Sequence, residues 1–331
     1  MVVRASIAGT GSCNGDLVVS SADLDRLHGL PSGAVERLTG VRARPRCEAL
    51  DQIDMASAAA RAALDDAGLE TGALDAVLHA AAVPWQAIPG TAPRLQHALG
   101  IRDGAVVAFD VNATCLSFLA ALHVATAAIE AGRWRNVLIA SAERASRGLD
   151  WNVPATAGLF GDGAGAAVVS AVPHEGGGAV LDVSLETHPS AYDASTLVAG
   201  GTRLDHDADP DAFERHRRFR MDGHVLFGVT RRHFGAFVAR ALERVGWSLS
   251  DVDCVVPHQA SPMALAHMAR ALGVPPGRLT DITADHGNQI AASLPIALDR
   301  TRRDGRAEPG ARVLMLGTAA GVTFGAAALR M

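Results

Sequence analysis

Lysine is absent from this chain of 331 residues, and all 30 of its basic residues are arginines. The absence excludes chemistry that depends on a lysine amine, such as a Schiff base or the phosphate-binding lysine of a P-loop. The chain is also rich in alanine and glycine, and this composition is typical of a protein encoded by GC-rich DNA. The missing lysine therefore reflects composition and narrows the possible mechanisms without selecting one.

Cysteine is scarce and positive charge is not in excess. Four cysteines in a chain of this length do not form a disulfide framework, and no two of them have the CxxC spacing of a zinc site. The formal net charge is -5, whereas nucleic-acid-binding proteins usually carry an excess of basic residues. We therefore expect no metal and no nucleic-acid partner.

Long hydrophobic runs are also missing. No stretch of about 20 apolar residues is free of charge, and the beginning MVVRASIAGTGSC lacks the features of a signal peptide. We expect a cytoplasmic protein without a membrane span. Apolar residues make up 49% and charged residues 20%, which argues for a buried core and against disorder or a coiled coil.

The two halves of the chain repeat one pattern. ALDDAGLETGALDAVLHAAAVP (63–84) aligns without a gap with ALERVGWSLSDVDCVVPHQASP (241–262), so that Gly68 meets Gly246. In each segment a helix ends at the glycine, and an apolar strand begins after an aspartate. The alternative to a duplication is a single doubly wound sheet whose repeat is coincidental.

The two copies are expected to be residues 1–171 and 172–331, meeting in the glycine-rich AVPHEGGGAV. Alternating helices and short strands predict layered α/β structure. The long polar stretch from Thr187 to Gly223 is interpreted as a surface excursion. The pattern predicts helices at Asp54–Ala67, Leu116–Ala131, Arg231–Val245 and Pro262–Leu272, and strands at Val77–Ala81, Val137–Ala140, Ala164–Val169, Val255–Val256 and Val313–Leu316.

Cys115 is the candidate nucleophile. The polar stretch Asn112–Thr114 precedes it and a helix-like apolar run follows, which places it at a helix N-terminus. There the helix dipole and free amides lower the pKa of a thiol. Position alone leaves a second interpretation open, a buried structural cysteine. The other cysteines lack this setting; they are Cys13, Cys47 and Cys254.

Two further segments carry polar groups where strands give way to helices. His258 follows the apolar Val255–Pro257, and Asn288 follows Gly287 in a turn before a helix. Such positions are where α/β proteins place reactive groups. A lone histidine there is more often structural, and this chain has 13 of them.

In their order, these segments resemble the β-ketoacyl-[acyl-carrier-protein] synthase III family of the thiolase superfamily, over nearly the whole chain. The landmarks are TGVRAR (39–44), DVNATCLSFLAAL (110–122), LFGDGAGAAVV (159–169), MDGHVLF (221–227), VPHQAS (256–261), HGNQIAASLP (286–295) and GVTFGAAAL (321–329). The resemblance implies a thiolase fold, in which the duplicated α/β halves form α-β-α-β-α layers.

The resemblance also implies a catalytic triad of Cys115, His258 and Asn288. Cys115 would hold an acyl group as a thioester, and a malonyl-type thioester would then lose CO2. His258 and Asn288 would donate to the enolate oxygen, a role that suits asparagine because it donates without negative charge. The backbone N–H of Cys115, with that of Gly325 or a neighbour in the closing glycine turn, would form the oxyanion hole.

Several positions depart from the family pattern. Members that use coenzyme A commonly hold its adenine between a tryptophan and an arginine, and here Ala34 and Pro154 stand at those places. Met263 replaces an arginine that meets the carrier protein, although Arg270 lies further along the same predicted helix. His224 replaces an asparagine. These changes favour a carrier-bound donor, or coenzyme A bound in another way. The arginine-rich segment Glu214–Arg220 could meet a carrier or its phosphopantetheine, or be a solvated loop.

The resemblance further implies substrate contacts from Phe227, His224 and Trp85. It implies a homodimer, acyl-coenzyme A or acyl-carrier thioesters as substrates, and no bound cofactor. The expected function is decarboxylative condensation in polyketide or fatty-acid biosynthesis. The main alternative is an acyltransferase of the same fold that moves the acyl group to an alcohol, amine or thiol. A non-catalytic subunit and a degradative thiolase fit less well, because the triad is intact and GTAAGVTFG has no second cysteine.

Two other motifs are weaker. Gly161–Gly165 resembles a dinucleotide loop but precedes an apolar strand instead of a helix, so a tight turn is the better interpretation. The acidic and histidine residues of 205–209 lack a metal-ligand spacing, and a solvated loop is preferred there.

Overall fold

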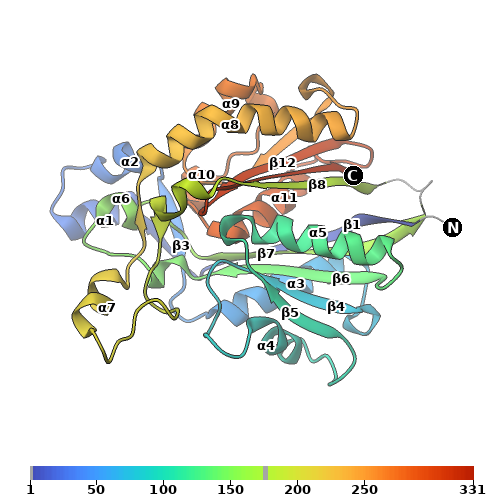
Figure 1. The fold of residues 1–331 in the computed structure, drawn as a ribbon, viewed down its shortest axis with the longest axis horizontal. Helices are drawn as coiled ribbons and strands as arrows, with labels where there is room; N and C mark the ends of the chain where they lie inside the picture. The colour runs from blue at the N-terminus through green and yellow to red at the C-terminus, as the bar shows by residue number, and fades with distance from the viewer. Residues whose placement is uncertain (1–2, 174–177) are drawn as a thin grey trace.

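Two main β-sheets divide the chain between them in the computed structural model, which describes residues 3–173 and 178–331 (Figure 1). The first has the strand order β1-β7-β6-β4-β5 and the second β11-β12-β13-β8. The first comprises β1 (Val3–Asn14), β4 (Ala76–Ala80), β5 (Val107–Val111), β6 (Asn136–Glu143) and β7 (Gly163–Pro173); the second comprises β8 (Ala179–Thr187), β11 (Cys254–Pro257), β12 (Arg312–Ala319) and β13 (Thr323–Arg330). Each sheet therefore draws its strands from one half of the chain.

The two sheets share a pairing scheme. In the first, β4 is parallel to β5 and β6, and β7 is antiparallel to β6 and β1. In the second, β11 is parallel to β12, while β13 is antiparallel to β12 and β8. Two short sheets lie outside them and pair β2 (Leu17–Ser20) with β3 (Ala43–Arg46), and β9 (Ser195–Thr196) with β10 (Arg220–Met221).

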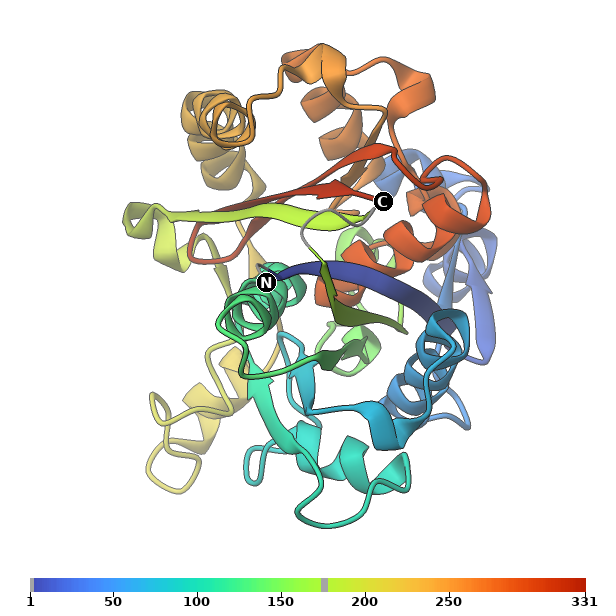
Figure 2. The same ribbon diagram turned by 90° about the vertical axis from the view of Figure 1, so that its right-hand side faces the viewer.

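Helices form three layers around the sheets. The outer face of the first sheet carries α3 (Gln52–Ala67) and α4 (Thr91–Ala98), and the outer side of the second carries α8 (Gly223–Arg244) and α9 (Pro262–Leu272). Between the sheets lie α5 (Ser117–Glu130) and α11 (Ser293–Arg303), one from each half, as Figure 2 shows from the side. The predicted α-β-α-β-α thiolase layering is confirmed.

One helix of the middle layer, α5, is built from sequence that is apolar over most of its surface. Helix α5 reads SFLAALHVATAAIE, and its buried side chains pack against both sheets. A helix that is apolar over most of its surface is stable only when enclosed, which accounts for its central place. Its first turn follows directly after Cys115.

The predicted elements correspond closely to the observed ones. Helix α9 has the predicted bounds, and α3, α5 and α8 overlap their predicted ranges. The surface excursion holds some regular structure, because Asp209 accepts the Ala212 N–H and caps α7 (Pro210–His216). The expected boundary between the halves, at residues 171 and 172, falls within β7; residues 174–177 of the seam lie outside the described part of the chain.

Four shorter helices complete the fold: α1 (Ser21–His28), α2 (Ala34–Thr39), α6 (Pro154–Ala157) and α10 (Thr283–His286). Over residues 3–173 and 178–331, no helix combines the length and the apolar character needed to cross a membrane.

Candidate active site

Cys115 lies in a 3-10 turn, Thr114–Leu116, that joins β5 to α5. Thr114 has a φ of 51°, a left-handed conformation that a β-branched residue rarely adopts. Hydrogen bonds hold it there: its N–H donates to Asn112 Oδ1 at 2.9 Å, and Ser117 Oγ donates to its carbonyl at 2.7 Å. The turn therefore presents Cys115 just before α5 begins.

Burial dominates the ionisation of Cys115. It raises the pKa of the thiol to about 12, and the carboxyl of Glu143 acts in the same direction. The backbone N–H groups of Ala320 and of Cys115 itself act against this rise but do not overcome it. The predicted lowering of the pKa by the helix N-terminus is therefore wrong, because lost hydration outweighs the amide contacts. At neutral pH the group is a thiol.

Glu143 is a residue of this site that the sequence analysis missed. It ends β6, is fully buried, and accepts the Ala82 N–H through Oε1 at 2.5 Å, while Oε2 has no hydrogen-bond partner among the described residues. Burial raises the pKa of this carboxyl to about 8. The available signal was a single acidic residue at the end of the apolar strand NVLIASAE.

His258 follows β11 and is held from both ends. Its N–H donates to the Leu316 carbonyl at 2.7 Å, and its Nδ1 lies 2.6 Å from Ser293 Oγ. Burial lowers the pKa of the imidazole to about 4, so the ring is neutral at physiological pH. The sequence analysis identified the histidine but not Ser293.

A glycine allows His258 to approach the nucleophile turn. A Cβ atom on Gly317 of β12 would lie 2.7 Å from Leu116 Cδ2 and 3.0 Å from His258 Cβ. Any side chain there would force these two neighbours apart. Gly317 thus lets the turn of Cys115 and the histidine pack against the same point of the second sheet.

Asn288 has a fixed amide orientation. Its Oδ1 accepts the Ile290 N–H at 2.9 Å, and its Nδ2 donates to the Ala260 carbonyl at 3.2 Å. Because Ala260 stands two residues after His258, this bond ties the amide to the histidine segment. One Nδ2 hydrogen is used in it, and the second is left for a ligand.

The three candidate residues stand on segments that contact one another. The turn of Cys115 packs against β12 and against the 3-10 turn Ile290–Ala292, which follows Asn288. The structure thus brings together the segments that carry a partly buried thiol, a neutral imidazole and an amide donor. A thiol can accept an acyl group, and the two neutral donors suit a developing oxyanion.

The second expected oxyanion-hole donor lies elsewhere than Gly325. Gly325 is inside β13, paired with Gly317 on one side and with Leu185 on the other, so its amide is directed within the sheet. The backbone N–H that acts on the Cys115 sulfur is that of Ala320, in the loop between β12 and β13. The structure therefore replaces Gly325 with Ala320 as the partner of the Cys115 amide.

The three expected substrate contacts do not form one group. His224 and Phe227 lie in the first turns of α8, and Phe227 packs on His267 of α9 with a centroid distance of 4.6 Å. Trp85 lies in the loop before α4, with Arg94 over its ring. Among the described contacts, nothing joins Trp85 to the α8 pair.

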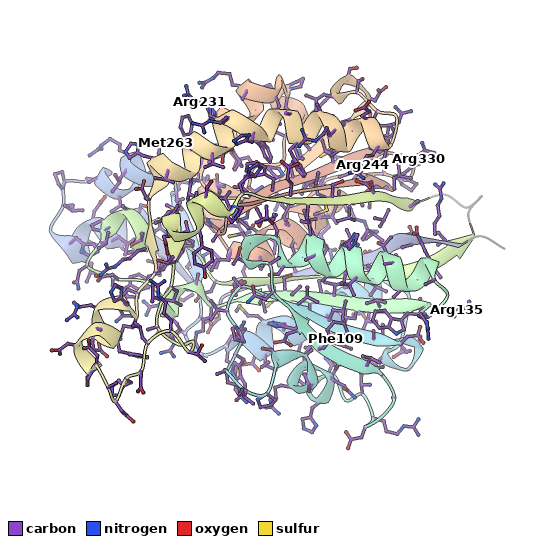
Figure 3. All side chains as sticks on the ribbon, in the orientation of Figure 1. Phe109, Arg135, Arg231, Arg244, Met263 and Arg330 are labelled. Carbon is purple, nitrogen blue, oxygen red and sulfur yellow. The ribbon has the colours of Figure 1, made fainter. Side chains whose placement is uncertain are left out.

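The positions at which the resemblance places the adenine clamp carry other residues and begin two neighbouring helices. Ala34 begins α2, Pro154 begins α6, and these two helices pack together. A methyl group and a proline ring offer neither an aromatic face nor a cation. Met263 on α9 is 68% exposed and lies in the outer layer (Figure 3). Arg270 of the same helix is also exposed.

The glycine segment before β7 has a structural role, as the sequence analysis preferred. Asp162 within it is fully buried and accepts the N–H groups of Cys47 and Ser146 at 2.9 and 2.8 Å. It also accepts the Ser146 hydroxyl at 2.7 Å. Asp162 therefore joins β3, β6 and β7 behind the site.

Comparison with known proteins gives a consistent result. Two family models match, 3-oxoacyl-[acyl-carrier-protein] synthase III over residues 109–189 and its C-terminal part over 242–331. The β-ketoacyl-[acyl-carrier-protein] synthase III of Rhodospirillum rubrum is 39% identical over 99% of each chain, and that of Bordetella petrii 38% over 99% of this chain and 98% of its own.

Solved structures agree. The 3-oxoacyl-(acyl carrier protein) synthase III of Pseudomonas aeruginosa has a TM-score of 0.89 at 34% identity, covering 99% of this chain and 98% of its own. A priming β-ketosynthase from a polyketide biosynthetic pathway has a TM-score of 0.89 at 29% identity, covering 99% of this chain and 96% of its own.

Proposed function

This chain belongs to the 3-oxoacyl-[acyl-carrier-protein] synthase III family, and from that premise we propose that Cys115 takes an acyl group from a thioester and passes it to a malonyl-type thioester with loss of CO2. The observation that carries the proposal is the contact between the Cys115 turn, the Asn288 turn and β12 beside His258. Fatty-acid or polyketide biosynthesis is the setting in which its relatives are named.

The first step acylates Cys115. The sulfur attacks the thioester carbonyl, and the negative oxygen is held by the backbone N–H groups of Cys115 and Ala320. Because the thiol has a pKa of about 12, its proton must be removed as the bond forms. The neutral His258 accepts that proton and returns it to the departing sulfur, so the products are the acyl-enzyme and a free thiol.

The second step forms the carbon–carbon bond. The malonyl thioester loses CO2, and the released electron pair makes an enolate whose oxygen binds the Nε2–H of His258 and the Nδ2–H of Asn288. The enolate carbon attacks the acyl carbonyl on Cys115. The sulfur leaves as a thiolate and takes up one proton, which restores the thiol.

Ser293 sets the state of the imidazole between these steps. Its Oγ lies 2.6 Å from His258 Nδ1 and 2.8 Å from the Ile290 carbonyl, and its single hydrogen serves one of them at a time. Donation to Ile290 leaves Nε2 bare, as proton transfer from Cys115 requires. Donation to Nδ1 leaves the proton on Nε2, as binding of the enolate requires. Ser293 is therefore a positioning residue.

A second copy of the chain is the expected partner. Strand β5 is an edge of the first sheet, and its side chains Val107 and Phe109 are 49% and 37% exposed. Figure 3 shows the position of Phe109. An exposed edge strand with large apolar side chains is a pairing surface. Light scattering after size exclusion should give twice the mass of the chain, and a monomer at micromolar concentration would contradict this assignment.

The experiment for the reaction is intact-protein mass spectrometry with acyl-coenzyme A and acyl-carrier thioesters, followed by malonyl-carrier protein. We expect a mass increase that disappears in Cys115→Ala, then release of CO2 and a β-ketoacyl product. Acylation of Cys115 without decarboxylation from any malonyl thioester would contradict condensation and support acyl transfer to an alcohol, amine or thiol.

A further inference from the structure

Four arginine side chains line a pocket of about 400 Å³ next to the end of β3. They are Arg46 at the end of β3, Arg144 and Arg147 after β6, and Arg218 before β10. They come from three separate segments of the chain. We call this site the arginine pocket; Trp151 and Glu48 also line it.

The guanidinium groups of the arginine pocket are not neutralised by ion pairs. Over residues 3–173 and 178–331, none of the four forms a salt bridge with a carboxylate. The Nε of Arg144 is buried and has no hydrogen-bond partner there. Buried donors without partners are rare in native proteins, and this one belongs to a side chain that lines the pocket.

The few contacts of these arginines orient them. Arg46 stacks on the Trp151 ring at 4.6 Å, and the Nε1–H of Trp151 donates to the Ser146 carbonyl at 3.2 Å. Arg144 Nη2 donates to the Cys47 carbonyl at 3.3 Å. The four arginines outnumber the one carboxylate of the lining, and like-charged groups repel one another, so their placement favours an anion.

The back of the pocket is rigid. Asp162 accepts the N–H groups of Cys47 and Ser146, and Asp16 accepts those of Glu48 and Ala49 at 2.9 Å each. These two carboxylates hold backbone amides instead of arginines. They therefore fix the segments that carry the guanidinium groups.

The net charge of the lining residues indicates how much negative charge the anion carries. Four guanidinium groups and the Glu48 carboxylate leave the lining with a net charge of +3. A single phosphomonoester carries about -1.5 to -2 at neutral pH, so one phosphoryl group leaves positive charge unbalanced. Arginine binds phosphate oxygens bidentately, and the volume holds more than one phosphoryl group.

We propose that the arginine pocket binds an anion with two phosphoryl groups. The same chemistry has two sources, a free diphosphate or the nucleotide end of an acyl-coenzyme A. The second source rests on the proposed function and would compensate for the missing clamp at Ala34 and Pro154. The first source is independent of it.

Titration calorimetry with inorganic pyrophosphate on the full chain tests the site. We expect saturable binding that weakens about tenfold in Arg147→Gln and about tenfold in Arg218→Gln, because each removes a charge-assisted hydrogen bond. The double variant should bind least. Arg147 is exposed and Arg218 donates only one long bond, 3.5 Å, so both variants should fold.

The matched control is Arg135→Gln, an exposed arginine at the far end of the first sheet (Figure 3). It should bind pyrophosphate like the unchanged protein. Equal weakening in Arg135→Gln would show general charge attraction and overturn the proposal. So would the absence of saturable binding, or unchanged affinity in the double variant with unchanged melting temperature.

Acylation kinetics then distinguish the two sources. If the ligand is the nucleotide end of coenzyme A, the double variant raises KM for acyl-coenzyme A but not for an acyl-pantetheine, and pyrophosphate competes with the first alone. If the ligand is a free diphosphate, both KM values stay unchanged while pyrophosphate binding is lost. If no thioester, the acyl-carrier thioesters included, acylates Cys115, the proposed function is contradicted, and the pyrophosphate titration still decides the pocket.

Discussion

The turn that carries Cys115 and the turn that follows Asn288 have the same construction. In each, an asparagine Oδ1 accepts the N–H two residues later at 2.9 Å, from Asn112 to Thr114 and from Asn288 to Ile290. The residues that donate these N–H groups, Thr114 and Ile290, have left-handed φ angles of 51° and 50°. In each, a buried serine then donates to that residue's carbonyl, at 2.7 and 2.8 Å.

The two turns differ in what they present. Cys115 occupies the position that Ala291 occupies in the other turn. Ala80, at the end of β4, is the residue that aligns with His258 in the repeated segments. Glu143 ends β6, whereas Ala319 ends β12. The duplicated fold thus provides one backbone geometry twice, and side-chain substitutions give the thiol to one copy and the imidazole to the other.

The asparagines offer the sharpest test of this division, with the largest expected effect. Asn288→Ala should lower the condensation rate about 100- to 1000-fold, because it removes a donor to the enolate oxygen, and leave acylation of Cys115 nearly unchanged. Asn112→Ala should slow both steps together by less than tenfold, because it only loosens the turn. Single-turnover mass spectrometry measures the two steps separately.

Two results would contradict this prediction. In one, Asn112→Ala slows condensation much more than acylation; in the other, Asn288→Ala slows acylation as much as condensation. Either result would show that the two turns act alike. The melting temperatures of both variants serve as the control for folding.

Glu143 gives the next largest effect, on stability. Folding raises the pKa of its carboxyl from about 4.5 to about 8, so the unfolded chain loses this proton first as the pH rises. The free energy of unfolding should therefore be undiminished below pH 4.5 and fall by a few kcal/mol between pH 4.5 and 8. Glu143→Gln should remove this fall. Urea denaturation of both proteins at pH 5, 6.5 and 8 checks it, and parallel trends would refute it.

The serines give the smallest effect. Ser293→Ala should lower condensation about tenfold and change its pH profile, because His258 Nδ1 loses its partner. Ser117→Ala removes an equally buried hydroxyl and a similar turn bond, and should cost about 1 kcal/mol of stability without changing the pH profile. A pH profile that is the same in both variants would remove Ser293 from the mechanism.

Much of the fold follows from local sequence. Periodicity predicted α3, α5, α8 and α9 and the strands between them, because apolar spacing depends only on neighbouring residues. The repeated segments at 63–84 and 241–262 indicated two copies before any contact was known. Cys115, His258 and Asn288 could be identified because each stands in a segment that resembles a motif of the family.

The sequence by itself determined the duplication, the order of elements and the candidate triad. Only the tertiary structure decided the raised pKa of the Cys115 thiol, the contributions of Glu143 and Ser293, the replacement of Gly325 by Ala320, and the arginine pocket. Each of these depends on burial or on a partner far away in the chain. Hydration lost on folding and distances between remote segments are not encoded in local pattern, so they enter only when the two halves pack together.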